Sequence, residues 1–446
     1  MNLKYHIWSI GCQMNDADAR HLSARLESRG YLPALRAKDA HILIINTCVV
    51  RQQAEDKIYL QLEHASARKR KHKKVIIALM GCLVGNNGVS EDLKRRFPFV
   101  DVFMPPSNPQ PLLDFLQPSP AGTAGEEKEG DLSQAEEYNL PQLEKGSSIV
   151  AHVPIVLGCS HACSFCIIPY RRGPEKSRPK KDILEEVRRL AEQGIKEVIL
   201  LGQIVDRYGL DFQDGTDLAG LLHETARVEG LKRLRFLTGH PNWFTDRLLE
   251  TVAVEQKVCP HFEIPFQSGN DEVLSRMRRG YTADDYRRLI ERIRRRIPEA
   301  GIHTDIIVGF PGETEDQFMD SYRLLKEINP VMARIAKYSP RPQTLAARQM
   351  EDDVPEAEKE RRRVLLEDLL AELLTERHKA LLHTQVEVLV EAKGKKNRWG
   401  GRTPQSALVF FDSEQDLRGE LVRVTLDWTG PFSLIGHLPD AAAAEV

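Results

Sequence analysis

Three cysteines lie close together in the segment GCSHACSFC. Cys159, Cys163 and Cys166, here called the loop cysteines, have the spacing CxxxCxxC. Three thiolates from one loop can each bind one iron of a [4Fe–4S] cubane, and the fourth iron is then open to chelate a substrate. Zinc is the alternative, but a structural zinc normally takes four ligands, and the fourth would have to be His161 or a distant residue. The spacing therefore favours an iron–sulfur cluster.

Three further cysteines are far apart in the sequence but share one context. Cys12, Cys48 and Cys82, here called the strand-end cysteines, each follow an apolar run that predicts a strand. A single cysteine in this position is usually a small core residue. The carboxyl ends of neighbouring parallel strands meet at one edge of a sheet, so three such thiols can converge there. The pattern predicts a second three-cysteine cluster.

The seventh cysteine, Cys259, belongs to neither set. We expect it to be a free thiol in the core or at the start of a strand. Seven cysteines in 446 residues are too few, and odd in number, for a disulfide scaffold. Clustered cysteines in a reducing compartment more often indicate metal or redox chemistry.

The region 1–117, which carries the strand-end cysteines, alternates between expected strands and helices. Helical patterns cover Asp16–Arg29, Gln52–Lys71 and Glu91–Phe97. Alternation of this kind indicates a parallel sheet, and unbroken apolar runs indicate strands covered on both faces. The strand candidates are HIWSIGC, HILIINTC, KVIIALMGC and VDVFMP.

A second αβ series covers 148–340, with helical patterns at Asp182–Gln193 and Ala283–Arg296. Its six βα units suit an open, incomplete βα barrel better than a closed eight-fold barrel. The strand candidates are HVPIVLG, EVILLG, LRFLTG, HFEIPFQ, HTDIIVGF and MARIAKYS.

Chemistry in such sheets takes place at the carboxyl ends of the strands. Gly202, Gln203, Gln267 and Ser268 lie at these ends, and glycine there lets the backbone approach a ligand closely. We expect cofactor binding at these residues, with ordinary turn chemistry as the alternative.

The remaining segments differ in composition. Residues 118–147 carry seven acidic residues and two lysines among Pro, Gly and Ala, which is typical of a linker. Pro355–Leu382 predicts a charged helix, and 384–438 has the short runs of a small β-barrel or sandwich. The expected parts are 1–117, 118–147 (linker), 148–382 and 383–440.

Composition excludes some classes of protein. Hydrophobic residues make up 41% and charged residues 29%, which is ordinary for a globular protein. The longest apolar stretch is far shorter than a membrane span, and the N-terminus turns polar too early for a secretory signal. We expect a cytoplasmic protein with no membrane partner.

A net charge of −2 excludes a strong global attraction to nucleic acid, so a basic binding face must be local. RKRKHKK at 68–74 has six Lys or Arg residues, and KGKKNRWGGR at 393–402 has five basic residues and Trp399. Phosphates need cations, and unstacked RNA bases pack on aromatic faces. Both segments are candidates for RNA contact; a solvated helix end is the alternative for the first.

The residues around both cysteine sets resemble the radical S-adenosylmethionine (SAM) methylthiotransferase family. The run GCSHACSFCIIPYRRGPEKSRP resembles its signature, and GCQMN, NTC and the third GC resemble its N-terminal domain. GFPGET is also similar, and 393–402 lies in a region that resembles the TRAM domain, a β-barrel RNA-binding module. The resemblance implies an α/β fold with an N-terminal parallel αβ domain, a central radical SAM partial (βα)6 barrel and a TRAM-like β-barrel.

The resemblance also implies the cofactors, which are two [4Fe–4S] clusters and SAM. The loop cysteines would hold the cluster whose open iron binds SAM, and the strand-end cysteines would hold an auxiliary cluster that presents the sulfur. Phe165 matches a position beside the nucleoside of SAM, with core packing as the alternative. The implied reaction cleaves SAM to a 5′-deoxyadenosyl radical, removes hydrogen from C2 of adenine and transfers a methylated sulfur to that carbon.

Within the family, GCQMN, GHP (239–241), HFEIPFQSG and YRRG look most like the branch that modifies N6-isopentenyladenosine beside the tRNA anticodon. Ile204, Asp206, Gly239 and Pro174 depart from that branch. The implied partners are the tRNA anticodon stem-loop, an electron donor and a sulfur donor. Threonylcarbamoyl-adenosine and an aspartate of a ribosomal protein are alternative substrates. A zinc RNA-binding module and an electron-transfer protein are alternatives outside the family.

Overall fold

The computed structural model describes residues 3–49, 52–86, 89–116, 148–394 and 397–439. The expected linker at 118–147 lies outside the described residues. The chain divides into two compact units. The first unit consists of Met1–Gln142, Leu157–His161 and Ile167–Arg189. The second consists of Leu143–Val156, Ala162–Cys166 and Leu190–Val446.

The first unit contains a five-stranded parallel sheet with the order β2-β1-β3-β4-β5. All four predicted strands are present, and β2 is an additional two-residue edge strand. The strands are β1 (Lys4–Ser9), β2 (Leu32–Pro33), β3 (Ile42–Thr47), β4 (Ile76–Gly81) and β5 (Val102–Met104).

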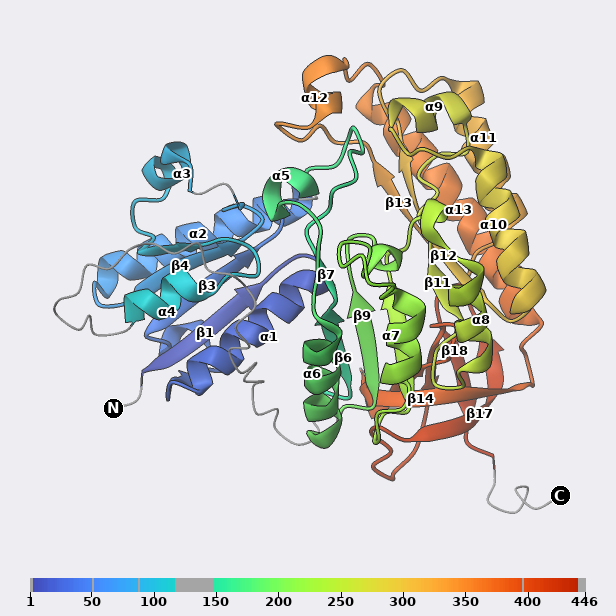
Figure 1. The fold of residues 1–446 in the computed structure, drawn as a ribbon, viewed down its shortest axis with the longest axis horizontal. Coiled ribbons are helices and arrows are strands. Elements are labelled where there is room, and N and C mark those ends of the chain that lie inside the picture. The colour runs from blue at the N-terminus through green and yellow to red at the C-terminus, as the bar shows by residue number, and fades with distance from the viewer. Residues whose placement is uncertain (1–2, 50–51, 87–88, 117–147, 395–396, 440–446) are drawn as a thin grey trace. The chain divides into compact units, whose positions relative to one another are not determined.

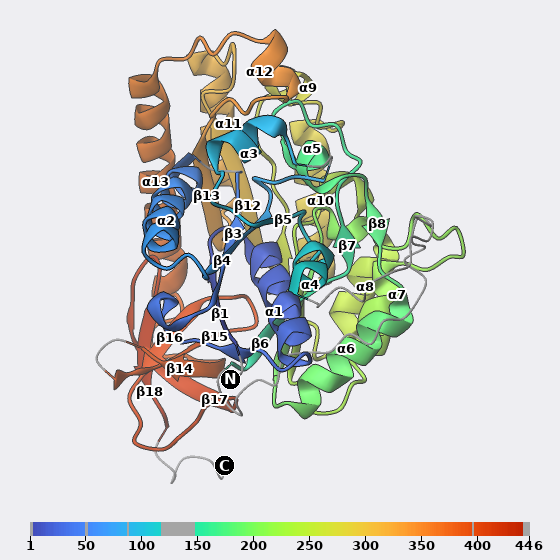
Figure 2. The same ribbon diagram turned by 90° about the vertical axis from the view of Figure 1, so that its left-hand side faces the viewer.

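Helices cover both faces of this sheet, as the unbroken apolar runs predicted. Alternate strand residues point to opposite faces, so Leu43 and Ile45 pack towards α2 while Ile42 and Ile44 pack towards α1 and α4. Figure 2 shows α2 on one side of β3 and β4, and α1 and α4 on the other. The helices are α1 (Gln13–Glu27), η1 (Ala37–Asp39), α2 (Gln52–Lys71), α3 (Glu91–Arg96) and α4 (Gln110–Leu116).

Two helices of the first unit differ from the prediction. Helix α1 starts at Gln13, a turn earlier than predicted, because Cys12 in extended conformation is its N-cap. Helix α4 was not predicted because it is only seven residues long, yet its Leu112 and Leu113 are fully buried against the sheet.

The second unit contains six parallel strands in the order β6-β9-β10-β11-β12-β13. Two three-stranded sheets are joined by a bridge between Leu234 of β10 and Val258, just before β11. Among the described residues no pairing joins β13 back to β6, so the predicted incomplete (βα)6 barrel is confirmed. The strands are β6 (Val150–Pro154), β9 (Glu197–Leu201), β10 (Arg233–Leu237), β11 (His261–Glu263), β12 (Gly301–Val308) and β13 (Met332–Lys337).

Amphipathic helices line the outer side of these strands (Figure 1). In α10, Tyr286, Leu289, Ile290 and Ile293 form the buried stripe, and Thr282 starts the helix with a capping box. The other elements of the unit are η2 (Val205–Arg207), α7 (Leu218–Thr225), η3 (Pro241–Trp243), α8 (Asp246–Val254), α9 (Asp271–Arg276), α10 (Ala283–Arg296), α11 (Glu315–Ile328) and α12 (Leu345–Gln349). The first unit also contains α5 (Ile168–Arg172), β8 (Lys176–Ser177) and most of α6 (Lys180–Glu192), and β7 (Val156–Leu157) precedes the loop cysteines.

The predicted charged helix and small β domain are both present at the end of the chain. Helix α13 (Glu356–Lys379) leads into a closed barrel with the order β14-β15-β16-β18-β17. The strands are β14 (Gln385–Lys393), β15 (Trp399–Arg402), β16 (Leu408–Phe411), β17 (Leu421–Thr429) and β18 (Leu434–His437). Among the described residues, no helix has the length and apolar character that crossing a membrane requires.

Candidate functional site

The strand-end cysteines follow three neighbouring strands of the first sheet. Cys12 follows β1, Cys48 follows β3 and Cys82 follows β4, and β1, β3 and β4 are adjacent. Cys48 and Cys82 are buried and Cys12 is half-buried. The amide of Cys82 donates to the carbonyl of Thr47, at 3.0 Å, which ties the two turns together. The parallel sheet thus brings the three turns to one edge.

Gly11 allows the first two of these turns to approach each other. Its φ of +142° favours glycine, and a Cβ at this position would lie 2.6 Å from the Cβ of Cys48. Only a residue without a side chain can therefore bring the backbone beside Cys12 this close to Cys48.

Asn15 joins the ends of the same strands. Its side-chain amide donates to the carbonyls of Ile10, at 3.0 Å, and Thr47, at 2.9 Å. Asn46 donates in turn to the carbonyl of Asn15, at 2.7 Å. These bonds satisfy buried backbone groups and fix the spacing of the turns that carry Cys12 and Cys48.

A buried arginine lies beside these thiols. The guanidinium of Arg172 donates to Asn15 Oδ1, at 2.9 Å, and to Asp18 Oδ2, at 3.2 Å. Its positive charge also acts on the Cys82 thiol. Burial raises the pKa of Cys82, and the positive charge of Arg172 opposes that rise. Cys12 and Cys82 are close enough to interact electrostatically.

The donor set at this edge suits an iron–sulfur cluster. Within the described ranges none of the seven cysteines forms a disulfide, and the Nε of Arg172 is buried without a hydrogen-bond partner. Soft thiolate ligands beside a positive charge fit an anionic cluster. Among the described residues, no three His, Cys, Asp or Glu side chains are placed to share a single metal ion. A cubane makes a different demand, since each thiolate binds its own iron.

The loop cysteines follow β7, and the two units divide within their loop. Cys159 belongs to the first unit, where it is buried and its amide donates to the carbonyl of Gly173, at 3.0 Å. Cys163 and Cys166 belong to the second unit, and the amide of Cys166 donates to the carbonyl of Cys163, at 3.2 Å. Both of these are half-buried.

Ser164 fixes the part of this loop that lies in the second unit. Its amide donates to the carbonyl of Met277, at 3.0 Å, and its hydroxyl to the carbonyl of Arg276, at 2.7 Å. Its own carbonyl accepts from Ala346, at 2.8 Å. The serine between Cys163 and Phe165 thus holds the loop with three hydrogen bonds.

A second buried arginine contacts a loop cysteine. Nη1 of Arg279 donates to the sulfur of Cys163, at 3.2 Å. The hydroxyl of Tyr281 and the carbonyl of Pro265 accept from other nitrogens of the same guanidinium, at 3.1 and 3.4 Å. Buried groups therefore hold the guanidinium of Arg279 in contact with the Cys163 thiol.

The four residues predicted at the strand ends of the second unit all lie at its βα turns. Two of them, Gly202 and Ser268, pack against neighbouring residues of the protein. A Cβ on Gly202 would lie 3.0 Å from the backbone of Val205. The hydroxyl of Ser268 is fully buried and lies 3.4 Å from that of Ser321. Ordinary turn packing accounts for both observations.

The two glutamines differ from this pattern. Gln203 is half-buried after β9. Gln267 has a φ of 65°, which is unusual for a residue other than glycine, and its Oε1 is buried without a hydrogen-bond partner among the described residues. A backbone held in this conformation with an unsatisfied acceptor is typical of a ligand-binding position.

Phe165 packs in a small core cluster of the second unit. Its ring meets that of Phe310 edge-on, with 6.4 Å between centroids, and the cluster includes Met277. The ring is only partly buried, so it retains an accessible portion.

Cys259 is a buried thiol near the start of a strand, as predicted. It is 3% exposed, and its amide donates to Leu234 of β10, just before β11 begins. Burial raises the pKa of Cys259 to about 11, so the thiol is protonated at neutral pH.

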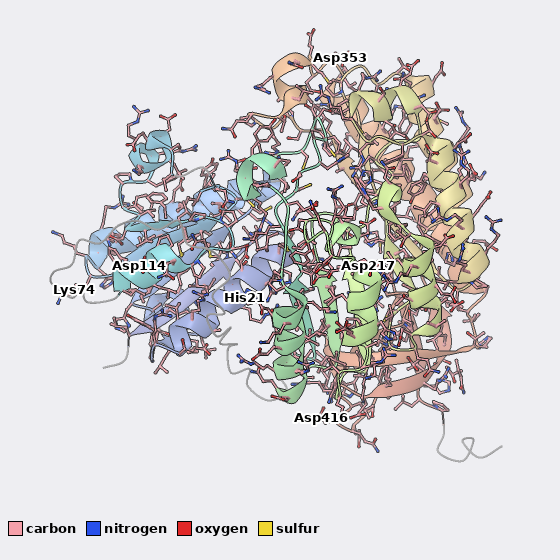
Figure 3. The ribbon with its side chains drawn as sticks, viewed as in Figure 1. His21, Lys74, Asp114, Asp217, Asp353 and Asp416 are labelled. Atoms are coloured by element: carbon pink, nitrogen blue, oxygen red, sulfur yellow. The ribbon has the colours of Figure 1, made fainter. Side chains whose placement is uncertain are left out.

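The first basic segment, residues 68–74, is only partly available to a ligand. Arg68 is tied to the carbonyl of Ala40, at 2.6 Å, and Lys69 to Asp101, at 2.5 Å. Residues 71–74 are exposed, including Lys74, which Figure 3 labels.

We expected Trp399 to offer its ring to RNA from a loop, and this expectation is wrong. Trp399 starts β15, is 2% exposed in the barrel core, and donates through Nε1 to Gln415 O, at 3.0 Å. The exposed aromatic residues of this barrel are Trp428 and Phe432, at 50% and 54%.

Sequence reasoning missed Asn15, Arg172 and Arg279 as parts of the sites. Asn15 and Arg172 lie in the motifs GCQMN and YRRG, so the signal was present. Arg279 lies in the run MRRGY, where nothing in the sequence separates it from the exposed Arg278 beside it.

Comparisons with known families and proteins agree with this geometry. The model of the "Radical SAM superfamily" matches residues 153–325, and that of "Uncharacterized protein family UPF0004" matches residues 4–105. The first match covers the loop cysteines, and the second covers the strand-end cysteines.

Curated relatives match nearly the whole chain. A protein of Roseiflexus sp. (strain RS-1) is 45% identical over 98% of this chain and 89% of its own length. One of Chloroflexus aurantiacus is 44% identical over 99% and 93%, and one of Dehalococcoides mccartyi (strain CBDB1) is 43% identical over 97% and 98%. All three are named tRNA-2-methylthio-N(6)-dimethylallyladenosine synthase.

Solved structures of lower identity share the fold. The radical S-adenosylmethionine methyltransferase TsrM from Kitasatospora setae is 15% identical, with a TM-score of 0.52 over 78% of this chain and 77% of its own. The cobalamin-dependent radical enzyme OxsB is 11% identical, with a TM-score of 0.52 over 83% and 55%. With the fold, the cysteine arrangement and the full-length relatives in agreement, this chain belongs to the radical SAM methylthiotransferase family.

Proposed function

We propose that this chain is a tRNA-modifying enzyme that adds a methylthio group to C2 of N6-dimethylallyladenosine, the nucleoside also called N6-isopentenyladenosine, next to the anticodon. One observation carries the proposal. Cys12, Cys48 and Cys82 meet at one sheet edge in a chain that has a separate CxxxCxxC loop. The names of the full-length relatives support the choice of substrate.

Two sets of thiolates hold the cofactors in this proposal. Cys159, Cys163 and Cys166 hold the [4Fe–4S] cluster that binds SAM, and the strand-end cysteines hold the auxiliary [4Fe–4S] cluster. When bound, the clusters and SAM supply radical and sulfur chemistry that acid and base side chains cannot perform at an aromatic C–H bond.

Protein side chains position these groups. Arg279 orients Cys163 through the contact of 3.2 Å. The unsatisfied Oε1 of Gln267 supports a role in SAM or substrate binding, and Gln203 lies at the corresponding turn of β9. Phe165 places a partly buried ring one residue before Cys166, suited to pack against a nucleoside. Gly202 and Ser268 keep the turns of this surface compact.

The tRNA is held by exposed basic and aromatic side chains. The exposed end of the basic segment, residues 71–74, offers cations to phosphates, and the small barrel offers the exposed rings of Trp428 and Phe432. The target base must leave its stack to reach the enzyme. The functional division follows 1–117, 148–382 and 383–440. An electron donor and a sulfur donor complete the reaction, which takes place in the cytoplasm.

Analysis of the product nucleoside tests this function. The anaerobic, cluster-loaded enzyme is incubated with SAM, a reductant and tRNA that carries N6-dimethylallyladenosine, and the nucleosides are identified by mass spectrometry. We expect the 2-methylthio derivative. Parallel reactions contain tRNA with threonylcarbamoyl-adenosine or ribosomal protein instead. Product from either of these and none from the first tRNA would contradict the proposed substrate.

A further inference from the structure

Arg172 is a buried charged residue beside the strand-end cysteines, and several groups hold its side chain. Its side chain is 2% exposed, as is that of its partner Asp18. Asn15 accepts a second hydrogen bond from the same nitrogen, and Ser107 Oγ lies 3.4 Å from Nη1. Asn86 donates to the backbone carbonyl of Arg172, at 3.0 Å. The guanidinium is therefore held in one orientation from several sides.

This orientation leaves part of the guanidinium for the cysteines. The positive charge of Arg172 acts on the Cys82 thiol, and the Cys12 thiol lies 3.8 Å from the Asn15 oxygen that accepts from Arg172. The Nε–H is buried and has no partner among the described residues. A buried donor of this kind costs free energy unless a bound group accepts from it.

An iron–sulfur cluster on three thiolates is such a group. It carries net negative charge and accepts hydrogen bonds at its sulfurs, and both factors set its reduction potential. The one carboxylate paired with Arg172, Asp18, does not reach the Nε–H in the structure, so this donor is available to sulfur.

We propose that Arg172 is a positioning residue of the auxiliary site, whose Nε–H donates to a sulfur of the bound cluster and whose positive charge stabilises the cluster's reduced form. This inference rests on the proposed function, because it requires a cluster on the strand-end cysteines. Asp18 and Asn15 orient the guanidinium, and Asp18 also reduces its net field at the cluster.

The test uses the full-length chain with the loop cysteines replaced by alanine, so that only the strand-end cysteines can bind iron. Arg172→Gln and Asp18→Asn are introduced separately into this parent, and Lys176→Gln is the control because it removes an exposed cation from the same segment. Each chain is reconstituted anaerobically. Iron and sulfide are counted, and the midpoint potential for one electron from dithionite is measured by electron paramagnetic resonance.

If these charges act on the cluster, Arg172→Gln and Asp18→Asn should shift its midpoint potential in opposite directions. Removing the positive charge of Arg172 should lower the potential, with about a tenfold change in the oxidised-to-reduced ratio, or about 59 mV for one electron. Removing the negative charge of Asp18 should raise the potential. Lys176→Gln should leave it unchanged. Equal potentials in all variants, or shifts of the same sign for Arg172→Gln and Asp18→Asn, would overturn the inference.

Loss of the cluster in Arg172→Gln would also test the inference, through rescue by lysine. If that chain keeps its circular dichroism but binds no iron, Arg172→Lys must restore most of the iron, since it returns the positive charge. Failure of lysine to restore iron would show that the charge is not what the site requires. A parent chain that binds no iron would instead contradict the auxiliary cluster of the proposed function.

Discussion

The guanidinium of Arg279 contacts the sulfur of Cys163, with 3.2 Å between Nη1 and Sγ. Burial disfavours the charge of Arg279, but Tyr281 and Cys163 outweigh it and raise the pKa of Arg279. A permanent cation that donates to this sulfur orients the side chain and suits a site for an anionic iron–sulfur cluster.

Replacing Arg279 should therefore impair the SAM-binding site alone. We expect Arg279→Met to reduce SAM cleavage at least about tenfold, since hydrogen bonds to charged groups contribute about 1.5–3 kcal/mol. The measurement is the rate of 5′-deoxyadenosine formation, alongside iron content in a chain whose strand-end cysteines are alanine. Arg278→Met is the matched control, because Arg278 is exposed. Equal losses in both variants would refute a specific role for Arg279.

The two cysteine sets should separate in function. Cys163→Ala should abolish SAM cleavage, whereas Cys48→Ala should preserve cleavage and stop sulfur insertion. Cys259→Ala should leave both activities and the iron content intact, because this buried thiol lies outside both sets. SAM cleavage and methylthio product are measured in the same reactions. Full sulfur insertion by Cys48→Ala would remove it from the auxiliary site.

Gly11 tests the geometry of the strand-end cysteines without changing a ligand. In Gly11→Ala the new methyl would lie 2.6 Å from Cys48 Cβ, so Cys48 must move and the auxiliary iron should be lost. Gly30→Ala is the control. Gly30 also has positive φ, +83°, but no atom lies within 4 Å of the added methyl. It should cost only about 1–2 kcal/mol of stability through backbone strain. Equal iron content in the two variants would contradict the close approach.

The sequence predicted the sheets, the barrel and the strands that precede Cys12, Cys48 and Cys82, because apolar runs and turn residues are local signals. The sequence did not show which residues of the same type are buried and which are exposed. Trp399 was assigned to a binding loop, but β15 places it in the core, while Trp428 is exposed on β17. Which face of a short strand is buried depends on its partners, and those are set by the whole barrel.

These two tryptophans should therefore respond oppositely to truncation. Trp399→Ala should destabilise the barrel by about 3–5 kcal/mol, as large core truncations do. Trp428→Ala should change stability by less than about 0.5 kcal/mol, as surface substitutions usually do, but should raise the KM for tRNA. Urea unfolding and tRNA titration distinguish the two effects. An unchanged KM in Trp428→Ala would remove this ring from the RNA-binding surface.

Two buried histidines of the second unit should make stability depend on pH. Burial, aided by Arg334, lowers the pKa of His303 to about 3, and burial also lowers the pKa of His261. In the unfolded chain both titrate near the usual 6.5. Below pH 6.5 the unfolded chain binds protons at these histidines that the folded chain does not bind. The stabilisation of the folded chain by the two neutral histidines is therefore present above pH 6.5 and is lost as the pH falls towards 3.

The expected slope is about 1.4 kcal/mol per pH unit for each proton. Urea unfolding midpoints between about pH 6.5 and pH 5 measure this slope. His303→Gln should reduce it by about one proton. A slope that is unaffected by this substitution would show that His303 is not held neutral in the folded chain.

Counting iron and sulfide in three anaerobically reconstituted chains tests the central claim most directly. Two independent cubanes predict roughly eight irons in the wild type and roughly four in each chain that has one cysteine set replaced by alanine. Each single-set chain should also contain sulfide in equal number to its iron. If replacing either set removed all of the iron, or if the strand-end cysteines alone bound none, the account of two separate clusters would be contradicted.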